Sequence, residues 1–214
     1  MAPQQLLTRF QDRPLDFAPG GQWQYSNSNY VVLGALIERI SGLSYAEFIR
    51  QHIFVPLGMH DSGYDSPSTV IPRRADGYQR TAAGLLNAGY ADMSVPYAAG
   101  GLYSTVEDLL KWTRGLFGGK LLPPAGVQRL ITPVKDGYGF GVFVQTDSQG
   151  RLHVSHTGGI AGFSSALVYY PASRITVVTL SNIEPGGPGA TGMTLAATLG
   201  RLAHGDELPP PVTR

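Results

Sequence analysis

The feature that most constrains the fold is a change of sequence period near residue 138. From there on, four segments are rich in β-branched and aromatic residues, namely 138–145, 151–155, 163–170 and 175–180. Turn-forming sequences at 147–150 and 171–174 separate them. Links this short join antiparallel neighbours. The later part of the chain is therefore predicted to form an antiparallel sheet.

The earlier part carries helix signals instead. Residues 28–41 are apolar on almost every side, which predicts a buried helix that Gly42 ends. Capping-box sequences at 44–47 and 104–107 predict two more helices, which stop at 56–59 and 118–119. A short helix is predicted after Pro124, ending near Ile131. A last amphipathic helix carries Met193, Leu195, Leu199 and Leu202.

Between these helices, residues 60–99 are rich in Gly, Pro, Ser and Asp and are predicted to form a long irregular excursion. Loops of this length inside a compact domain are usually functional. Helices followed by an antiparallel sheet with a covering helix define an α+β fold.

Composition excludes several classes of function. The formal net charge is +1, with 16 basic and 15 acidic side chains, so no basic surface for nucleic acid or for a membrane is expected. The chain has no cysteine, which excludes a thiol nucleophile and thiolate metal sites. No apolar run is long enough to cross a membrane, and the first residues do not look like a signal peptide. We therefore expect a soluble protein, with its compartment left open.

Two short motifs could carry chemistry. Tyr25-Ser26-Asn27 precedes the first long helix, where a phenol could move a proton and a carboxamide could bind a substrate carbonyl. His156-Thr157-Gly158-Gly159 ends a predicted strand, where a backbone N–H could face a developing oxyanion. Taken singly, each has a simpler interpretation: a polar helix-capping turn for the first and a glycine turn with an exposed histidine for the second.

A third motif, Ala98-Ala99-Gly100-Gly101-Leu102, leads into the helix predicted from Ser104. On its own it is best interpreted as a tight turn.

The order of these motifs resembles that of the β-lactamase-related serine hydrolases, which include class C β-lactamases, D-alanyl-D-alanine carboxypeptidases, D-aminopeptidases and β-lactamase-like carboxylesterases. The similarity runs from about Phe17 to about Leu202. The matching phrases are 17–20 with 25–27, 49–59, 99–105 with Asp108, 138–141, 156–159 with 162–163, and 181–182.

The resemblance implies roles for particular residues. Tyr25 would exchange a proton with the nucleophile and the leaving group, and Asn27 would hold the substrate. His156 stands where many relatives have the lysine of Lys-Thr-Gly, and the N–H of Gly159 would form half of an oxyanion hole. Substrate-binding candidates are Thr157, Gly158, Gly100 and Gly101. No metal or other cofactor is implied, and the substrates would be small esters, amides, β-lactams or D-amino-acid peptides.

The family's nucleophile, the serine of Ser-x-x-Lys, has no counterpart in this sequence, because no serine is followed by lysine three positions later. We therefore expect a C-terminal portion of the β-lactamase/transpeptidase-like fold that lacks the family's N-terminal helix and first strands. The prediction is one partial domain over 1–214: a lead-in at 1–24, a helical region with the long loop at 25–135, strands and the last helix at 136–205, and a frayed tail at 206–214.

Three functions stay open at this stage. The chain could be part of a serine hydrolase whose nucleophile lies in another segment. It could be a non-catalytic relative that binds a ligand, or that self-associates or is complemented through the exposed edge of the strand at 175–180. It could also use another nucleophile such as Ser26. A metal site is not expected, because His153 and His156 should face opposite sides of one strand.

Overall fold

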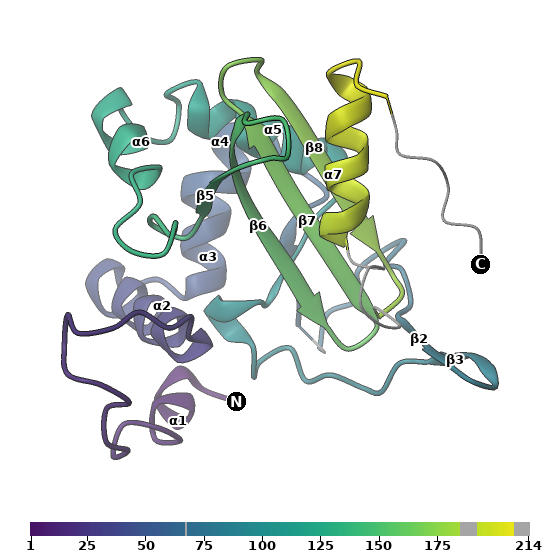
Figure 1. Cartoon of the computed structure of the whole chain (residues 1–214). Coiled ribbons are helices and arrows are strands. Elements are labelled where there is room, and N and C mark those ends of the chain that lie inside the picture. Colours follow the sequence, from purple (N-terminus) through teal and green to yellow (C-terminus); the bar gives the residue numbers. More distant parts are fainter. Residues whose placement is uncertain (67, 185–191, 208–214) are drawn as a thin grey trace. The chain divides into compact units, whose positions relative to one another are not determined.

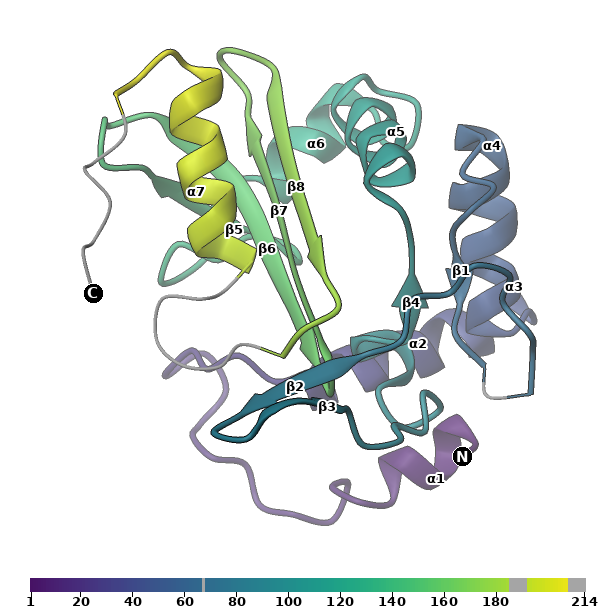
Figure 2. The ribbon, with the colours of Figure 1, turned by 90° about the vertical axis from the view of Figure 1, so that its right-hand side faces the viewer.

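The computed structural model describes residues 1–66, 68–184 and 192–207. The chain divides into two compact units. Unit 1 comprises residues 1–74 and 90–115, and unit 2 comprises residues 75–89 and 116–214. Figures 1 and 2 show the elements of both.

Unit 1 is mainly helical. Its helices are α1 (Pro3–Leu7), α2 (Asn27–Ser41), α3 (Tyr45–Ile49), a π-helical turn (Arg50–Phe54), α4 (Val55–Leu57), a 3₁₀ turn (Tyr97–Ala99) and most of α5 (Val106–Phe117). Two short strands, β1 (Gly63–Tyr64) and β4 (Leu102–Tyr103), pair antiparallel. Its core consists of Leu6, Val31, Tyr45, Ile49, Phe54, Met59 and Tyr97.

The predicted helix boundaries in unit 1 have clear local causes. The Ser44 hydroxyl caps α3 by accepting a hydrogen bond from the Glu47 N–H at 3.2 Å. Gly42 and Gly58 end α2 and α4 in the left-handed conformation. The cap of α5 is shifted by one residue from the prediction, because the Thr105 hydroxyl accepts from the Asp108 N–H at 3.2 Å.

The predicted burial of the first long helix is wrong within the described chain. Only Val31 and Gly34 of α2 are buried. Val32, Leu33, Leu36 and Ile40 are 45%, 51%, 49% and 77% exposed. A helix that is apolar on most sides is usually buried on those sides. In α2, the described residues cover only the side that carries Val31 and Gly34.

Unit 2 is built on an antiparallel sheet of β5 (Phe143–Thr146), β6 (Leu152–Ile160), β7 (Phe163–Tyr170) and β8 (Ile175–Ser181), which lie in this order. All neighbours pair antiparallel, as predicted. The strand expected at 138–145 begins later, at Phe143, and β6 runs to Ile160, beyond its predicted end. The short helix α6 (Pro124–Leu130) lies where it was predicted.

Different elements pack against the two faces of the sheet. Buried residues of β7 and β8 pack against α7 (Gly192–Ala203), which Figure 2 shows lying along the sheet. On β5 and β6, Val144 and Val154 pack instead against Phe117 and Leu130.

Of the apolar residues predicted for α7, Met193 packs against the core of unit 2, whereas the rest of the face that meets the sheet is made of small residues rather than the predicted leucines. Ala196 and Gly200 are buried. A Cβ on Gly200 would lie 2.6 Å from the Tyr170 hydroxyl, so the close approach requires glycine. Leu195, Leu199 and Leu202 are 54%, 37% and 49% exposed.

The excursion at 60–99 is more ordered than predicted. It contains a β-hairpin of β2 (Tyr78–Thr81) and β3 (Gly84–Asn87), visible in Figure 1. The base of the hairpin is held to the sheet of unit 2: the Tyr78 N–H donates to the Asn182 carbonyl at 2.9 Å, and the Glu184 N–H donates to the Tyr78 carbonyl at 2.8 Å.

None of the described helices combines the length and the apolar character needed to cross a membrane. The predicted link at 184–192 and the predicted frayed tail fall largely on residues 185–191 and 208–214, outside the described residues.

Candidate functional site

The first predicted motif lies in unit 1, at the start of α2. Ser26 occupies the N-cap position with extended backbone and makes no side-chain capping bond, and Asn27 is the first helical residue. The Tyr25 side chain is 39% exposed and its ring centroid lies 6.0 Å from that of Tyr30. Burial, with Tyr30 as a second cause, raises the pKa of Tyr25 above its usual value. Both causes act against formation of the phenolate.

The glycine pair Gly100-Gly101 also lies in unit 1, directly after the 3₁₀ turn that begins at Tyr97. A Cβ on Gly101 would lie 2.6 Å from the Tyr97 carbonyl oxygen and 2.8 Å from Tyr64, whereas Gly100 has only an ordinary contact with Pro96 at 3.5 Å. Gly101 is therefore required by packing. Its N–H donates to the same Tyr97 carbonyl at 2.7 Å.

Tyr97 itself was missed by sequence reasoning, although the structure gives it an unusual conformation. Its φ is 46°, a left-handed conformation that is strained for a bulky residue. Its side chain is 5% exposed and packs on Gly34 of α2, where a Cβ would approach the ring to 2.6 Å. Burial, together with Glu38, raises the pKa of the Tyr97 phenol. The glycine turn is thus held to α2 by a strained, buried tyrosine.

The second predicted motif lies in unit 2, on β6. The His156 Nδ1 lies 2.7 Å from the Thr157 carbonyl oxygen. Because a carbonyl can only accept, Nδ1 carries a proton, and in the neutral ring Nε2 is then the acceptor. Nε2 lies 3.5 Å from the Tyr138 hydroxyl, a weak contact, and the ring also lies 5.8 Å from that of Phe143.

The two glycines after Thr157 have different surroundings. A Cβ on Gly158 would lie 2.5 Å from the Ser165 hydroxyl, so this glycine is needed for the close contact with β7. Gly159 has nothing within 4 Å of its Cβ position. Since β5 pairs only with Leu152–Ser155, the stretch of β6 that follows has no described strand on that side. A ligand could bind to backbone groups along this edge.

The predicted site residues therefore fall into two sets. Unit 1 carries Tyr25, Asn27 and the Gly100-Gly101 turn, and unit 2 carries the 156–159 motif. Their convergence on one substrate remains a prediction.

The histidines do not form a metal site among the described residues, where no group of three or more His, Asp or Glu side chains is suitably placed. His153 pairs with Gln145 on β5, and its ring lies 5.8 Å from that of Tyr170 between centroids. His156 is three residues further along the same strand and faces the other side of the sheet. Burial lowers the pKa of His153.

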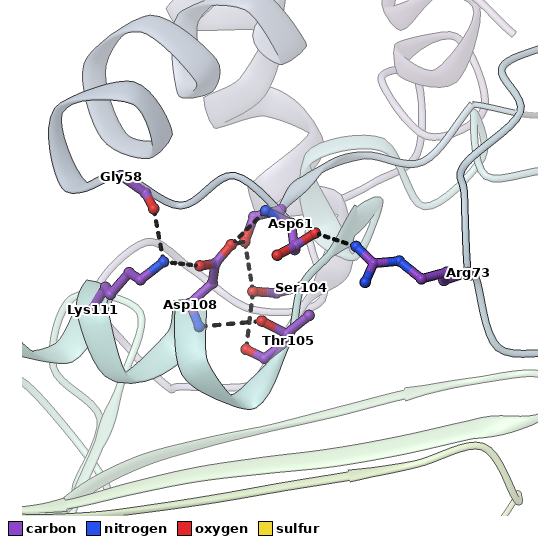
Figure 3. Close-up of polar contacts among 8 residues, drawn as sticks. Gly58, Asp61, Arg73, Ser104, Thr105, Asp108 and Lys111 are labelled. Atoms are coloured by element: carbon purple, nitrogen blue, oxygen red, sulfur yellow. Dashed lines mark hydrogen bonds and ion pairs between the residues drawn. The ribbon is translucent and has the colours of Figure 1, made fainter.

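A buried carboxylate, Asp108, organises the loop after α4 and was recognised in the sequence only as part of a family phrase. Its side chain is 1% exposed. Its oxygens accept from three donors: Lys111 Nζ at 2.7 Å, the Ser62 hydroxyl at 2.8 Å and the Asp61 N–H at 2.9 Å. Figure 3 shows the contacts with Lys111 and Asp61. Lys111 also donates to the Gly58 carbonyl at 2.8 Å.

The donors around Asp108 determine its ionisation. Burial raises its pKa, but the hydrogen bonds from Lys111, Ser62 and the Asp61 N–H outweigh burial and hold the pKa below its usual value. Asp108 therefore stays charged and ties the loop at 58–62 to the first turn of α5. These contacts connect two segments of unit 1.

Comparison with known proteins identifies the class of fold. The chain matches a penicillin-binding protein structure from Bacillus halodurans with a TM-score of 0.80 and 27% identity, over 94% of this chain and 62% of that one. The fold is therefore of the β-lactamase/transpeptidase type.

The family follows from the sequence matches. The Beta-lactamase family model matches residues 1–201, and the chain belongs to this family of serine hydrolases. It is 31% identical over 165 residues to the putative penicillin-binding protein PbpX of Bacillus subtilis and 28% identical over 197 residues to a D-aminopeptidase of Gluconobacter oxydans. These matches cover 77% and 88% of this chain but 41% and 37% of the relatives, so the chain spans about two fifths of their length.

Proposed function

We propose that this chain supplies the C-terminal part of a serine hydrolase that cleaves ester, amide or β-lactam bonds through an acyl-enzyme. The observation that carries the proposal is that the family's tyrosine, amide and glycine-strand motifs occur in the family's order while the sequence contains no Ser-x-x-Lys. The nucleophile would come from polypeptide outside residues 1–214.

The residues then divide the chemistry among them. The serine oxygen attacks the carbonyl carbon while its proton passes to Tyr25; the bond to the leaving group then breaks, and Tyr25 gives that proton to the leaving group. Water hydrolyses the resulting acyl-enzyme and regenerates the serine. Asn27 holds the substrate carbonyl, and the Gly159 N–H stabilises the oxyanion. The raised pKa of Tyr25 supports a lysine supplied by the same outside segment as the serine. A lysine cation beside the phenol would lower the pKa of Tyr25 and let it accept a proton.

His156 favours ester or D-amino-acid amide substrates over β-lactams. A neutral imidazole holds a substrate carboxylate less firmly than a lysine cation does. The similarity to a D-aminopeptidase agrees with this preference.

The exposed surfaces of unit 2 support a partner polypeptide. β8 is an edge strand whose described strand partner is β7 alone, and such an edge is a template for pairing. The exposed leucines of α7 add an apolar surface to the same unit. Complementation by another segment would cover these surfaces, and self-association of two copies is the alternative that size-exclusion chromatography would reveal.

A direct test extends the chain at its N-terminus with the upstream coding sequence and measures hydrolysis of p-nitrophenyl esters and D-amino-acid amides. The extension is expected to contain Ser-x-x-Lys and to confer turnover. Tyr25→Phe should then reduce kcat about 10²–10⁴-fold, as the loss of a general acid–base group does. Tyr30→Phe, which changes the neighbouring phenol, is the matched control. An inactive extended protein, or equal effects of the two substitutions, would overturn the proposal.

The second candidate is a non-catalytic relative that binds a ligand. It is favoured by the same missing nucleophile and by a phenol that keeps its proton in this chain. It predicts a stable protein without turnover even after extension.

A further inference from the structure

A serine and a histidine form a hydrogen-bonded pair in unit 2, outside the predicted motifs. Ser173 lies in the turn between β7 and β8, and His204 directly follows α7. The Ser173 hydroxyl is 2.9 Å from the His204 Nε2. The serine side chain is exposed, so small molecules can reach it.

The ring of His204 is held in one orientation. Its Nδ1 lies 2.7 Å from the Gly200 carbonyl oxygen, and the ring meets Tyr170 edge-on with centroids 4.7 Å apart. Because the carbonyl can only accept a hydrogen bond, the neutral imidazole has its proton on Nδ1. The Nε2 lone pair then accepts from the Ser173 hydroxyl. A nucleophile, a base and a group that orients the base are therefore all present.

This pair is separate from the 156–159 motif. Phe163, at the start of β7, pairs with Ile160, next to Gly159. Ser173 follows Tyr170, at the other end of the same strand. A strand of this length places the two ends about 23 Å apart.

We propose that Ser173, with His204 as its general base, is a second acyl-accepting site that reacts with small activated esters and phosphonofluoridates. The Ser173 oxygen attacks the carbonyl carbon of p-nitrophenyl acetate while its proton passes to His204 Nε2. The bond from that carbon to the p-nitrophenolate oxygen breaks, and p-nitrophenolate leaves. The imidazolium then gives its proton to water, and Ser173 remains acetylated. With a phosphonofluoridate, the Ser173 oxygen attacks phosphorus, the P–F bond breaks and fluoride leaves, and the proton follows the same route.

The structure favours Ser173 over Ser26, the alternative nucleophile suggested by the sequence. Ser26 is the N-cap residue of α2 and its side chain makes no capping bond there. Ser173 has an imidazole nitrogen within hydrogen-bonding distance, and the site is independent of the family nucleophile.

The test uses the whole chain, treated with p-nitrophenyl acetate or with a fluorophosphonate probe, followed by proteolysis and mass spectrometry to locate the modified residue. The modification is expected on Ser173, and Ser173→Ala should abolish it. His204→Gln removes the base and should slow modification about 100-fold, the low end of the range for general-base catalysis. Thermal unfolding of the His204→Gln variant shows whether α7 stays docked.

Ser148→Ala is the matched control, because Ser148 is an exposed serine in the turn between β5 and β6. Its substitution should leave the labelling unchanged. Modification at any other serine, or an unchanged rate in a folded His204→Gln variant, would overturn the proposal and leave the pair with the structural role of joining the β7–β8 turn to the end of α7.

Discussion

Replacing Asp108, in the first turn of α5, by asparagine should destabilise unit 1 more than removing the charge of Asp61 on the loop after α4. The substitution keeps the shape of the side chain but replaces one oxygen with an NH₂ donor. If the remaining oxygen still accepts from Lys111, the NH₂ group faces Ser62 and the Asp61 N–H. Ser62 can rotate its hydroxyl toward Ser104, 2.7 Å away, and accept. The Asp61 N–H cannot adapt and is left without an acceptor.

The magnitude follows from these contacts. An unsatisfied buried N–H costs about 1–3 kcal/mol. The hydrogen bond from Lys111 also weakens, by about 1 kcal/mol, because its acceptor is no longer negatively charged. The sum of about 2–4 kcal/mol corresponds to a fall in Tm of about 4–16 °C for a chain of this size. Far-ultraviolet circular dichroism during heating, or urea titration, measures the change.

Asp61→Asn is the matched control for this prediction. The Asp61 carboxylate pairs with Arg73 at 3.3 Å, a contact drawn in Figure 3. The Asp61 and Arg73 side chains are 56% and 86% exposed. Exposed pairs contribute about 0–1 kcal/mol. If Asp108→Asn lowered Tm no more than Asp61→Asn does, the buried carboxylate would not have the role assigned to it.

The pH dependence of the free energy of unfolding provides a second measurement on the Asp108→Asn variant. Because the folded-state pKa of Asp108 is lowered, its contribution to the free energy of unfolding is fully present above the unfolded-state pKa of about 3.9. That contribution is lost as the pH falls through the lower, folded-state pKa. The difference in stability between the original chain and Asp108→Asn should therefore be largest above about pH 4 and should shrink in more acid solution.

Three glycine substitutions, of which Gly159→Ala is a control, test close packing in the two units. Gly34→Ala would place a Cβ 2.6 Å from the buried ring of Tyr97 and should lower the free energy of unfolding by about 1–3 kcal/mol, measured by urea titration; an unchanged midpoint would contradict the tight contact. In Gly158→Ala the new Cβ would lie 2.5 Å from the Ser165 hydroxyl, so this substitution should lower the melting temperature of unit 2. In Gly159→Ala the Cβ would have nothing within 4 Å, so that variant should melt near the original temperature. Equal melting temperatures of the two variants would show that the strand adjusts at both positions.

The sheet of unit 2 was largely predictable because its signals are local. Alternating and β-branched residues with short turns determine both the strands and their antiparallel pairing, and the predicted run at 163–170 coincides with β7. The start of β5 was not predictable from composition. Tyr138 belongs to the same aromatic run, but it makes isolated bridges to Lys135 and Phe143 instead of joining the strand.

The β2–β3 hairpin was missed because its signals are weak. Its turn contains Ala82-Ala83 rather than Asn-Gly, and both strands are short. Long-range contacts with the strand end near Asn182 hold its base, and such contacts leave no periodic pattern. The shifted cap of α5 has a similar cause, since Ser104 and Thr105 are both acceptable caps and only the hydrogen bond from the Asp108 N–H decides between them.

The misjudged burial of α2 and α7 has a different physical origin. Hydrophobic periodicity predicts which sides of a helix are buried, but it does not indicate which polypeptide covers them. In unit 1, four apolar side chains of α2 remain at least 45% exposed, and in unit 2 the leucines at 195, 199 and 202 lie on the outer side of α7. The chain corresponds to 62% of the solved relative from Bacillus halodurans. Two separate units thus each show an exposed apolar helix side, and the partner segment that we propose would cover both.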